Sequence, residues 1–211
     1  MIDNTARALL PSVAGPFLAL YARLGLSPNA ISFIGFGIAA AAAAAVAIGV
    51  PWLAIALWWL SRLADGTDGI YARRHGLASR FGAYLDIVLD MAAYTLMVIG
   101  FAVWMPELQG RWLTIVALYV LCITSALALG MQEQQQGLPP RDDRGLRLGA
   151  GLAEGGETGI AYTVFLLFPE WLEAATAIWI GVLFTTVVAR SALAYRILEP
   201  VEPRPTLHSE E

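Results

Sequence analysis

Lysine is absent from this sequence of 211 residues, and all 13 basic residues are arginine. Charged residues of either sign are also scarce, at 14% of the chain, whereas a water-soluble domain of this size carries about 25%. Hydrophobic residues make up 58% of the sequence, and the mean hydropathy is +0.63. This composition excludes a water-soluble globular domain and predicts a single domain embedded largely in a membrane.

Cysteine and histidine are nearly absent as well. The single cysteine, Cys122, excludes an intramolecular disulfide and also a thiolate metal site or a redox motif. The two histidines, His75 and His208, fall in polar segments, and we expect no role for either. Because no basic tract is interleaved with aromatic residues, we expect no nucleic-acid partner.

Long apolar runs dominate what is present. About 20 apolar residues span the hydrocarbon core of a bilayer, and the hydropathy predicts six such transmembrane helices. They cover residues 30–50, 52–71, 81–104, 112–132, 152–168 and 171–196. We therefore expect an all-α integral membrane protein whose single domain covers residues 1–198, with a six-helix bundle at 30–196.

The arginines predict how this bundle is oriented. Most of those in the predicted loops fall on one side of the membrane, and Arg111 is the main exception. They are Arg73, Arg74, Arg80, Arg141, Arg144 and Arg147. By the positive-inside rule this side is cytoplasmic, so we expect an inner-membrane protein with both termini and the active site facing the cytoplasm. Four tryptophans on the other side predict an interfacial belt, namely Trp52, Trp104, Trp112 and Trp171.

The two ends of the chain differ from the bundle. Residues 3–24 mix apolar residues with Arg7, Tyr21 and Arg23, which predicts an amphipathic helix on the membrane surface within a juxtamembrane segment, 1–26. Ser27-Pro28 is typical of an N-cap followed by proline in the first turn of the next helix. Residues 199–211 hold three prolines and four acids, and we expect a disordered cytoplasmic tail.

Four aspartates lie inside these apolar segments, namely Asp65, Asp68, Asp86 and Asp90. A carboxylate in hydrocarbon costs about 2.5–3.5 kcal/mol, so four in one stretch need a common explanation. The first two are three residues apart and the last two are four apart, which puts each pair on one helix face. Two antiparallel helices with facing carboxylates predict a site for two divalent cations, Mg²⁺ or Mn²⁺, suited to phosphoryl transfer. Small residues around the aspartates would let a nucleotide approach closely; they are Gly66, Gly69, Ala72 and Gly82.

The whole string, D-x-x-D-G-x-x-A-R-x8-G-x3-D-x3-D, runs from Asp65 to Asp90. It resembles the signature of the CDP-alcohol phosphotransferase family, the CDP-alcohol phosphatidyltransferases. The resemblance implies transfer of a phosphatidyl-type group from a CDP-linked lipid, CDP-diacylglycerol, to the hydroxyl of a small polar alcohol, with release of CMP. It also implies that the protein forms a homodimer and contacts membrane lipids. The alcohol is not readable from the sequence, and a headgroup donor such as CDP-choline stays open.

The same resemblance implies roles for individual residues. Asp65 and Asp86 would bridge both metals, Asp68 would complete one metal site, and Asp90 would complete the other and act as the general base. The CDP-donor would be bound by Asn29, Ala30, Ile31, Ser32, Gly69, Ala72, Arg73, Ser79 and Gly82. An anionic acceptor could be bound by Arg141, Arg144, Arg147 and Arg190, although these arginines could equally be determinants of topology.

Alternatives remain open for several charged residues. The aspartates could form a cation pathway in a transporter, or belong to a membrane protein without catalytic activity. Arg62 could be a structural counter-ion to the aspartates. Glu154 and Glu157 could complement the dipole at a helix N-terminus or could contact the acceptor.

Overall fold

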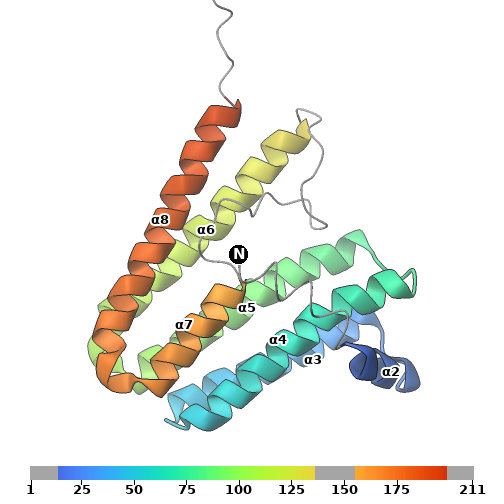
Figure 1. Cartoon of the computed structure of the whole chain (residues 1–211), viewed down its shortest axis with the longest axis horizontal. Coiled ribbons are helices and arrows are strands. Elements are labelled where there is room, and N and C mark those ends of the chain that lie inside the picture. Colours follow the sequence, from blue (N-terminus) through green and yellow to red (C-terminus); the bar gives the residue numbers. More distant parts are fainter. Residues whose placement is uncertain (1–13, 136–154, 199–211) are drawn as a thin grey trace, which may run out of the picture.

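The computed structural model describes residues 14–135 and 155–198, and 91% of these residues are helical, with no strand among them (Figure 1). The helices are α2 (Gly15–Arg23), α3 (Pro28–Ala47), α4 (Pro51–Arg74), α5 (Arg80–Trp104), α6 (Gln109–Gln135), α7 (Gly155–Leu167) and α8 (Leu172–Leu198). Two short 3-10 turns, η1 (Pro106–Leu108) and η2 (Pro169–Trp171), precede α6 and α8. The all-α architecture predicted from the sequence is confirmed.

Four of these segments are long and apolar enough to cross a membrane. They are Pro28–Ala47, Arg80–Trp104, Pro106–Gln135 and Pro169–Leu198. Helix α4 has the necessary length but carries five charged residues, four of them in its second half, and only 13 residues of α7 are described. The structure thus supports four of the six predicted spans by length and composition, and the other two predicted spans coincide with α4 and α7.

Serine caps and a glycine turn place the ends of α3, α4 and α5. Ser27 Oγ accepts a hydrogen bond from the backbone N–H of Ala30 at 3.2 Å, which confirms the predicted start of α3. Ser79 Oγ accepts one from the N–H of Gly82 at 3.0 Å and starts α5. Between them Gly76 ends α4 with a φ of +67°, a conformation that glycine adopts without strain. This tight connection brings the end of α4 beside the start of α5.

Helix α3 packs against both α4 and α5 through small residues. A Cβ at Gly35 would lie 3.3 Å from Ala64 Cβ and 3.6 Å from the backbone nitrogen of Asp65. A Cβ at Gly100 would lie only 2.5 Å from the carbonyl oxygen of Ala43. Because both glycines lack a side chain, α3 approaches its two neighbours closely and sets the distance between them.

Helices α6 and α8 form a second layer, and α7 contacts both α8 and α4 (Figure 1). Buried aromatic residues join the two layers. Tyr162 Oη donates a hydrogen bond at 3.0 Å to the carbonyl of Tyr94, and it also lies 3.0 Å from Tyr119 Oη. Trp179 Nε1 donates to the same Tyr119 oxygen at 3.1 Å. The hydroxyls of Tyr119 and Tyr162 and the Nε1 of Trp179 are therefore hydrogen-bonded within the bundle.

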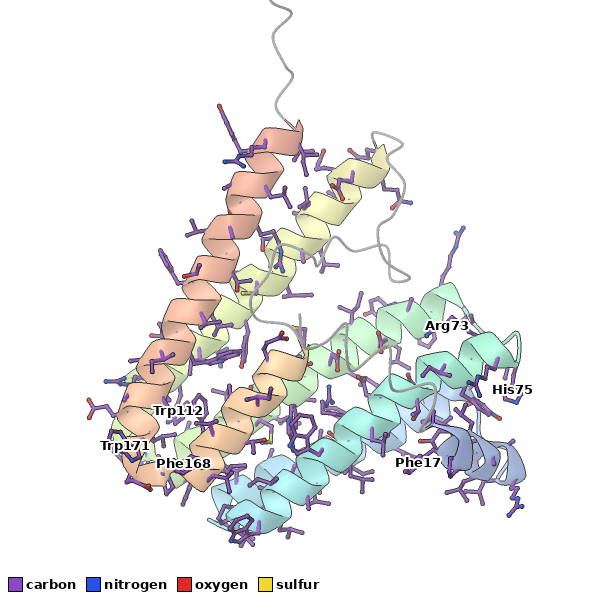
Figure 2. All side chains as sticks on the ribbon, viewed as in Figure 1. Phe17, Arg73, His75, Trp112, Phe168 and Trp171 are labelled. Atoms are coloured by element: carbon purple, nitrogen blue, oxygen red, sulfur yellow. The ribbon has the colours of Figure 1, made fainter. Side chains whose placement is uncertain are left out.

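The two ends of the bundle carry different residues. Figure 2 shows Arg73 and His75 at one end and Trp112 and Trp171 at the opposite end. Trp171 is 65% exposed, as expected for an interfacial belt. Trp112 is not: only 1% of it is exposed, and its Nε1 donates to the carbonyl of Met105 at 3.0 Å. The prediction of Trp112 as a belt residue was wrong, because hydropathy does not say which face of a helix meets lipid.

The described part of the predicted surface helix is α2, which docks on the Arg73 end of the bundle. Its Leu18 and Tyr21 are buried in a small core with residues of α3 and α4. Tyr21 Oη lies 3.0 Å from the Oγ1 of Thr67, a residue between the two aspartates of α4. Residues 1–13 of the predicted helix and the predicted tail at 199–211 lie outside the described residues.

Candidate metal centre

Three carboxylates from α4 and α5 meet at one place, although both helices pack mainly on α3. Oxygen atoms of Asp65, Asp68 and Asp86 all lie within 4.8 Å of one another. Asp65 and Asp68 are about one turn apart on α4, and Asp86 lies in the second turn of α5. Asp68 is buried, while Asp65 and Asp86 are half-buried. The predicted convergence of carboxylates from two helices is thus present in the fold.

This cluster suits a hard divalent cation. Oxygens around an octahedral Mg²⁺ with bonds of 2.0–2.1 Å are about 2.9 Å apart when adjacent and about 4.2 Å apart when opposite. The observed spacing of up to 4.8 Å is therefore within a small side-chain adjustment of one coordination sphere. All three ligands are carboxylate oxygens, which favour Mg²⁺ or Mn²⁺ over zinc. The donor set fits the metals predicted from the sequence.

Asp68 is held in place by two hydrogen bonds. Ser32 Oγ, on α3, donates to its Oδ2. The backbone N–H of Gly69 donates to its Oδ1 at 2.5 Å. Ser32 was predicted to bind the nucleotide of the donor, and in this structure its hydroxyl instead contacts a predicted metal ligand.

Asp90 forms an ion pair with Arg62. The guanidinium Nη1 of Arg62 lies 2.5 Å from Asp90 Oδ1 and 3.7 Å from Asp65 Oδ2. Both side chains are 12% exposed. The counter-ion role considered for Arg62 therefore has a specific geometry, in which Arg62 bridges the two helices through Asp90.

The residues predicted to bind the CDP-donor gather at the same end of the bundle. Arg73 is exposed and folds back over Gly69, where a Cβ would lie 3.3 Å from its Nη1. A Cβ at Gly82 would lie 3.2 Å from Ser79 Oγ and 3.5 Å from Asn29 Oδ1. The starts of α3 and α5 and the end of α4 therefore surround one small region beside the aspartates.

Other predicted binding residues have packing roles in this structure. Ile31 is 1% exposed and belongs to the small core with Tyr21 and Tyr71, and Ala72 is 8% exposed. The N–H of Ala30 is used by the cap of α3.

The acceptor-binding predictions fall on two parts of the chain. Arg190 is 2% exposed and donates to the carbonyl of Cys122 at 2.5 Å and to Ser125 Oγ at 3.3 Å, which ties α8 to α6. Arg141, Arg144 and Arg147 lie outside the described residues, and so does Glu154. Glu157 is half-buried in the first turn of α7, where its charge complements the helix dipole.

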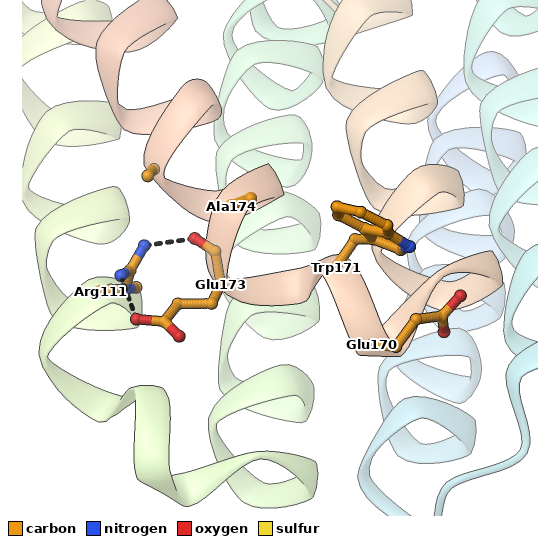
Figure 3. A pocket seen from close by; sticks show the side chains of 6 residues that line it. Arg111, Glu170, Trp171, Glu173 and Ala174 are labelled. Carbon is orange, nitrogen blue, oxygen red and sulfur yellow. Dashed lines mark hydrogen bonds and ion pairs between the residues drawn. The ribbon is translucent and has the colours of Figure 1, made fainter.

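A second polar region lies at the opposite end of the bundle. Figure 3 shows Arg111 Nη2 paired with Glu173 Oε1, at 2.9 Å. A pocket of about 390 Å³ opens there; it is lined by Arg111, Glu170, Trp171, Glu173, Ala174 and Ala177. Since its arginine is already paired with one of its acids, this pocket is a weaker candidate for chemistry than the aspartate cluster.

Sequence reasoning missed the aromatic partners of Arg62. The guanidinium carbon lies 4.6 Å from the ring centre of Trp58 and 5.4 Å from that of Tyr94. Trp58 precedes Arg62 by four residues and Tyr94 follows Asp90 by four, so helical spacing was the available signal.

Comparison with known protein families gives one match that covers most of the chain. The sequence pattern of a family described as CDP-alcohol phosphatidyltransferase matches residues 25–188. The Escherichia coli K12 inner membrane protein YnjF is 30% identical over 181 residues, covering 84% of this chain and 87% of that protein. A phosphatidylinositol phosphate synthase of Mycobacterium marinum is 28% identical over 182 residues, covering 82% and 78%.

Solved structures share the fold. The phosphatidylinositol phosphate synthase of Mycobacterium tuberculosis, with CDP-DAG bound, superposes with a TM-score of 0.65 at 21% identity, covering 87% of this chain and 94% of that one. The same enzyme in complex with manganese and citrate gives a TM-score of 0.63 at 20% identity, with coverage of 87% and 89%.

Proposed function

Because this chain belongs to the CDP-alcohol phosphatidyltransferase family, and is therefore a membrane-embedded transferase of phospholipid synthesis, we propose that it transfers a phosphatidyl group from CDP-diacylglycerol to a small polar alcohol and releases CMP. The observation that carries this proposal is the meeting of Asp65, Asp68 and Asp86 between α4 and α5. The bound CDP-DAG in the Mycobacterium tuberculosis structure supports the choice of donor.

Metal ions are part of the proposal. The family is metal-dependent, and a structural neighbour was solved with manganese. Two divalent cations, Mg²⁺ or Mn²⁺, would be held by the four aspartates, with Asp65 and Asp86 shared between them, Asp68 on one and Asp90 on the other. When bound, the cations would neutralise charge that develops on the diphosphate of the donor. The carboxylate oxygens and their spacing support this assignment.

The donor would bind across the ends of α3, α4 and α5. Gly69 and Gly82 leave space for the nucleotide, and the exposed guanidinium of Arg73 would offset the charge of the diphosphate. Ser79 and Asn29 lie beside Gly82 and would contact the nucleotide with their polar atoms. The segment from Asn29 to Ser32 would line this region through its backbone, because Ile31 is committed to the core.

The reaction itself needs one base. The oxygen of the alcohol attacks the phosphorus that carries the diacylglycerol, and the new phosphorus–oxygen bond forms as the bond to the CMP oxygen breaks. CMP leaves with the bonding electron pair, and the proton of the alcohol passes to a carboxylate oxygen of Asp90. Positioning and electrostatics supply most of the barrier reduction in such transfers.

All six helices from α3 to α8 would cross the inner membrane, in a single domain at residues 1–198. Helix α4 has 24 residues and is therefore about 36 Å long, enough for a bilayer. It packs along α3, which is itself a candidate span, so both lie at the same depth. The Arg73 end would face the cytoplasm together with both termini, and two copies would form a homodimer.

The acceptor would be an anionic alcohol if Arg190 or the arginines at 141, 144 and 147 contact it. Arg190 is buried on α8 and already holds α6, so a role in binding would require its side chain to turn. A cation pathway is disfavoured, because the guanidinium of Arg62 lies among the carboxylates that a moving cation would have to pass.

Purified protein in detergent would be given CDP-diacylglycerol, Mg²⁺ and a panel of alcohols, including glycerol 3-phosphate, inositol phosphate and serine. Release of CMP that depends on both the metal and one alcohol is the expected result. Absence of CMP release from folded protein with CDP-diacylglycerol and every alcohol of the panel would contradict the proposal. A Thr114→Ala variant, altered on an exposed face of α6, controls for the handling of the protein.

A further inference from the structure

Arg62 places a fixed positive charge beside the proposed base. Its Nη1 lies 2.5 Å from Asp90 Oδ1, a charge-assisted hydrogen bond between α4 and α5, and 3.7 Å from Asp65 Oδ2. The pairing with Asp90 is the closer one. Neither the family pattern, as carried over to this chain, nor the roles proposed above assign a function to this arginine.

The guanidinium is held from other directions as well. The rings of Trp58 and Tyr94 lie within 4.6 and 5.4 Å of it, within the range of cation–π attraction. Its Nε donates to Ser61 Oγ at 3.3 Å. An arginine that is fixed by its own helix and by α5 has few alternative rotamers, so its hydrogen bond to Asp90 is preorganised.

This contact restricts how the carboxylate of Asp90 can turn. With Oδ1 engaged by Arg62, rotation about the bond to the carboxylate is limited, and Oδ2 has a defined direction. A base must lie within hydrogen-bond reach of the proton that it accepts, and a displacement of about 1 Å can cost about 10²-fold in rate. Turnover therefore depends on the orientation of the Asp90 carboxylate.

We propose that Arg62 is a positioning residue that holds Asp90 through Oδ1 and so directs its second oxygen toward the hydroxyl of the acceptor. This inference rests on the proposed function of Asp90 as the base. It differs from a general counter-ion role, in which Arg62 only offsets the charge of the cluster. A counter-ion would act through the charge of the whole cluster, whereas a positioning residue acts through Asp90, so its effect on kcat disappears once Asp90 is replaced.

A double-mutant cycle separates these roles. Arg62→Gln and Arg62→Lys would be made in the wild-type and Asp90→Asn backgrounds, and kcat and KM for CMP release would be measured with CDP-diacylglycerol. We expect Arg62→Gln to lower kcat by about 10- to 100-fold, with the KM of the donor within about 3-fold of wild type. We expect no further loss from Arg62→Gln once Asp90 is asparagine. Arg62→Lys, which keeps the charge but not the planar fork, should retain part of the rate.

Two further measurements control the cycle. Titration of Mn²⁺, followed by the electron paramagnetic resonance of the free ion, should show that Arg62→Gln still binds the metal at least as tightly as wild type, because a positive charge has been removed. Arg111→Gln breaks a matched ion pair at the opposite end of the bundle and should leave kcat unchanged. If Arg62→Gln does not fold, as judged by its melting curve, Arg62→Lys takes its place in the same cycle.

Several results would overturn the inference. One is a kcat of Arg62→Gln within 2-fold of wild type. A second is a fold-loss in kcat from Arg62→Gln that is the same in the Asp90→Asn background as in the wild type. A third is a loss of kcat that is explained by weaker Mn²⁺ binding. A wild-type protein that releases no CMP would instead contradict the proposed function itself, and the inference with it.

Discussion

Ser32 on α3 donates a hydrogen bond from its Oγ to Oδ2 of Asp68 on α4. The other oxygen of the same carboxylate accepts from the backbone N–H of Gly69. The carboxylate of Asp68 is therefore oriented by one hydrogen bond from α3 and one from α4. Asp68 is also the more buried of the two aspartates on α4. Partners of this kind tune a metal ligand, because they fix its direction and its basicity.

Ser32→Ala should weaken metal binding while leaving the fold intact. Loss of an outer hydrogen bond to a metal ligand typically costs about 10- to 100-fold in affinity. We therefore expect the dissociation constant for Mn²⁺, measured by calorimetry in detergent, to rise by about 10-fold or more. Thr114→Ala, which removes only a hydroxyl bonded within its own helix, is the control. Equal affinities for Mn²⁺ in the two variants would show that Ser32 does not support the metal site.

Chelation should abolish turnover. Four carboxylates supply only oxygen, so activity lost in excess EDTA should return with Mg²⁺ or Mn²⁺ and not with zinc. Asp65→Asn and Asp86→Asn should bind Mn²⁺ most weakly of the four Asp→Asn variants, because each is proposed to contact both ions. Release of CMP in the presence of excess chelator would exclude a metal-dependent reaction.

Asp90→Asn should separate chemistry from binding. Asparagine keeps an oxygen of similar position but does not accept a proton at neutral pH. We expect kcat to fall by a factor on the order of 10²–10⁴, the range for a lost general base, with donor binding retained. Rates of CMP release and binding of labelled CDP-diacylglycerol would be measured side by side. Turnover within a few-fold of wild type would leave Asp90 as a metal ligand only.

Gly69→Leu should weaken binding of the donor. Even a Cβ at this position would lie 3.3 Å from Arg73 Nη1, so a leucine displaces the guanidinium and fills the space proposed for the nucleotide. Gly37→Leu is a matched control, since Gly37 lies on an exposed face of α3 with no neighbour within 4 Å of its Cβ position. The KM for CDP-diacylglycerol should rise only in the first variant. The same KM in both would place the nucleotide elsewhere.

Gly100→Ala should destabilise the bundle. The added Cβ would lie 2.5 Å from the carbonyl oxygen of Ala43, so α3 and α5 must move apart. Overpacking of this kind costs about 1–3 kcal/mol. Gly181 lies on α8 with no neighbour within 4 Å of its Cβ position, so Gly181→Ala should instead stabilise the protein by about 0.5–1 kcal/mol through higher helix propensity. Melting curves in detergent would compare the two, and an unchanged melting temperature for Gly100→Ala would contradict the close approach of α3 and α5.

The sequence predicted those features that depend on local spacing. The intervals within the aspartate motif and the short link after Arg74 were enough to place the aspartates on two adjacent helices. The cap at Ser27 follows from this serine and the proline after it. Such features depend only on the geometry of a helix, in which the spacing of residues along the chain sets which side chains share a face.

Features that depend on the rotation of a helix about its axis were not predictable. Whether Ser32 faces a nucleotide or Asp68, and whether Trp112 faces lipid or the core, depends on how neighbouring helices pack. The ion pair between Asp90 and Arg62 depends on the rotamer of Arg62, whose guanidinium lies against rings on two helices. The span predicted at residues 52–71 coincides with α4, whose five charged residues set it apart from the four segments that are apolar enough to cross a membrane.

The close contacts of α3 have a consequence for protein engineering. The separation of the carboxylates on α4 and α5 depends largely on α3, a helix that contributes no aspartate, through the missing side chains at Gly35 of α3 and at Gly100 of α5, where α5 contacts α3. Transplanting the aspartate motif onto another pair of helices would therefore copy the ligands without the spacing between them. The smallest portable unit of this site is three helices, α3 to α5, with both glycine contacts preserved.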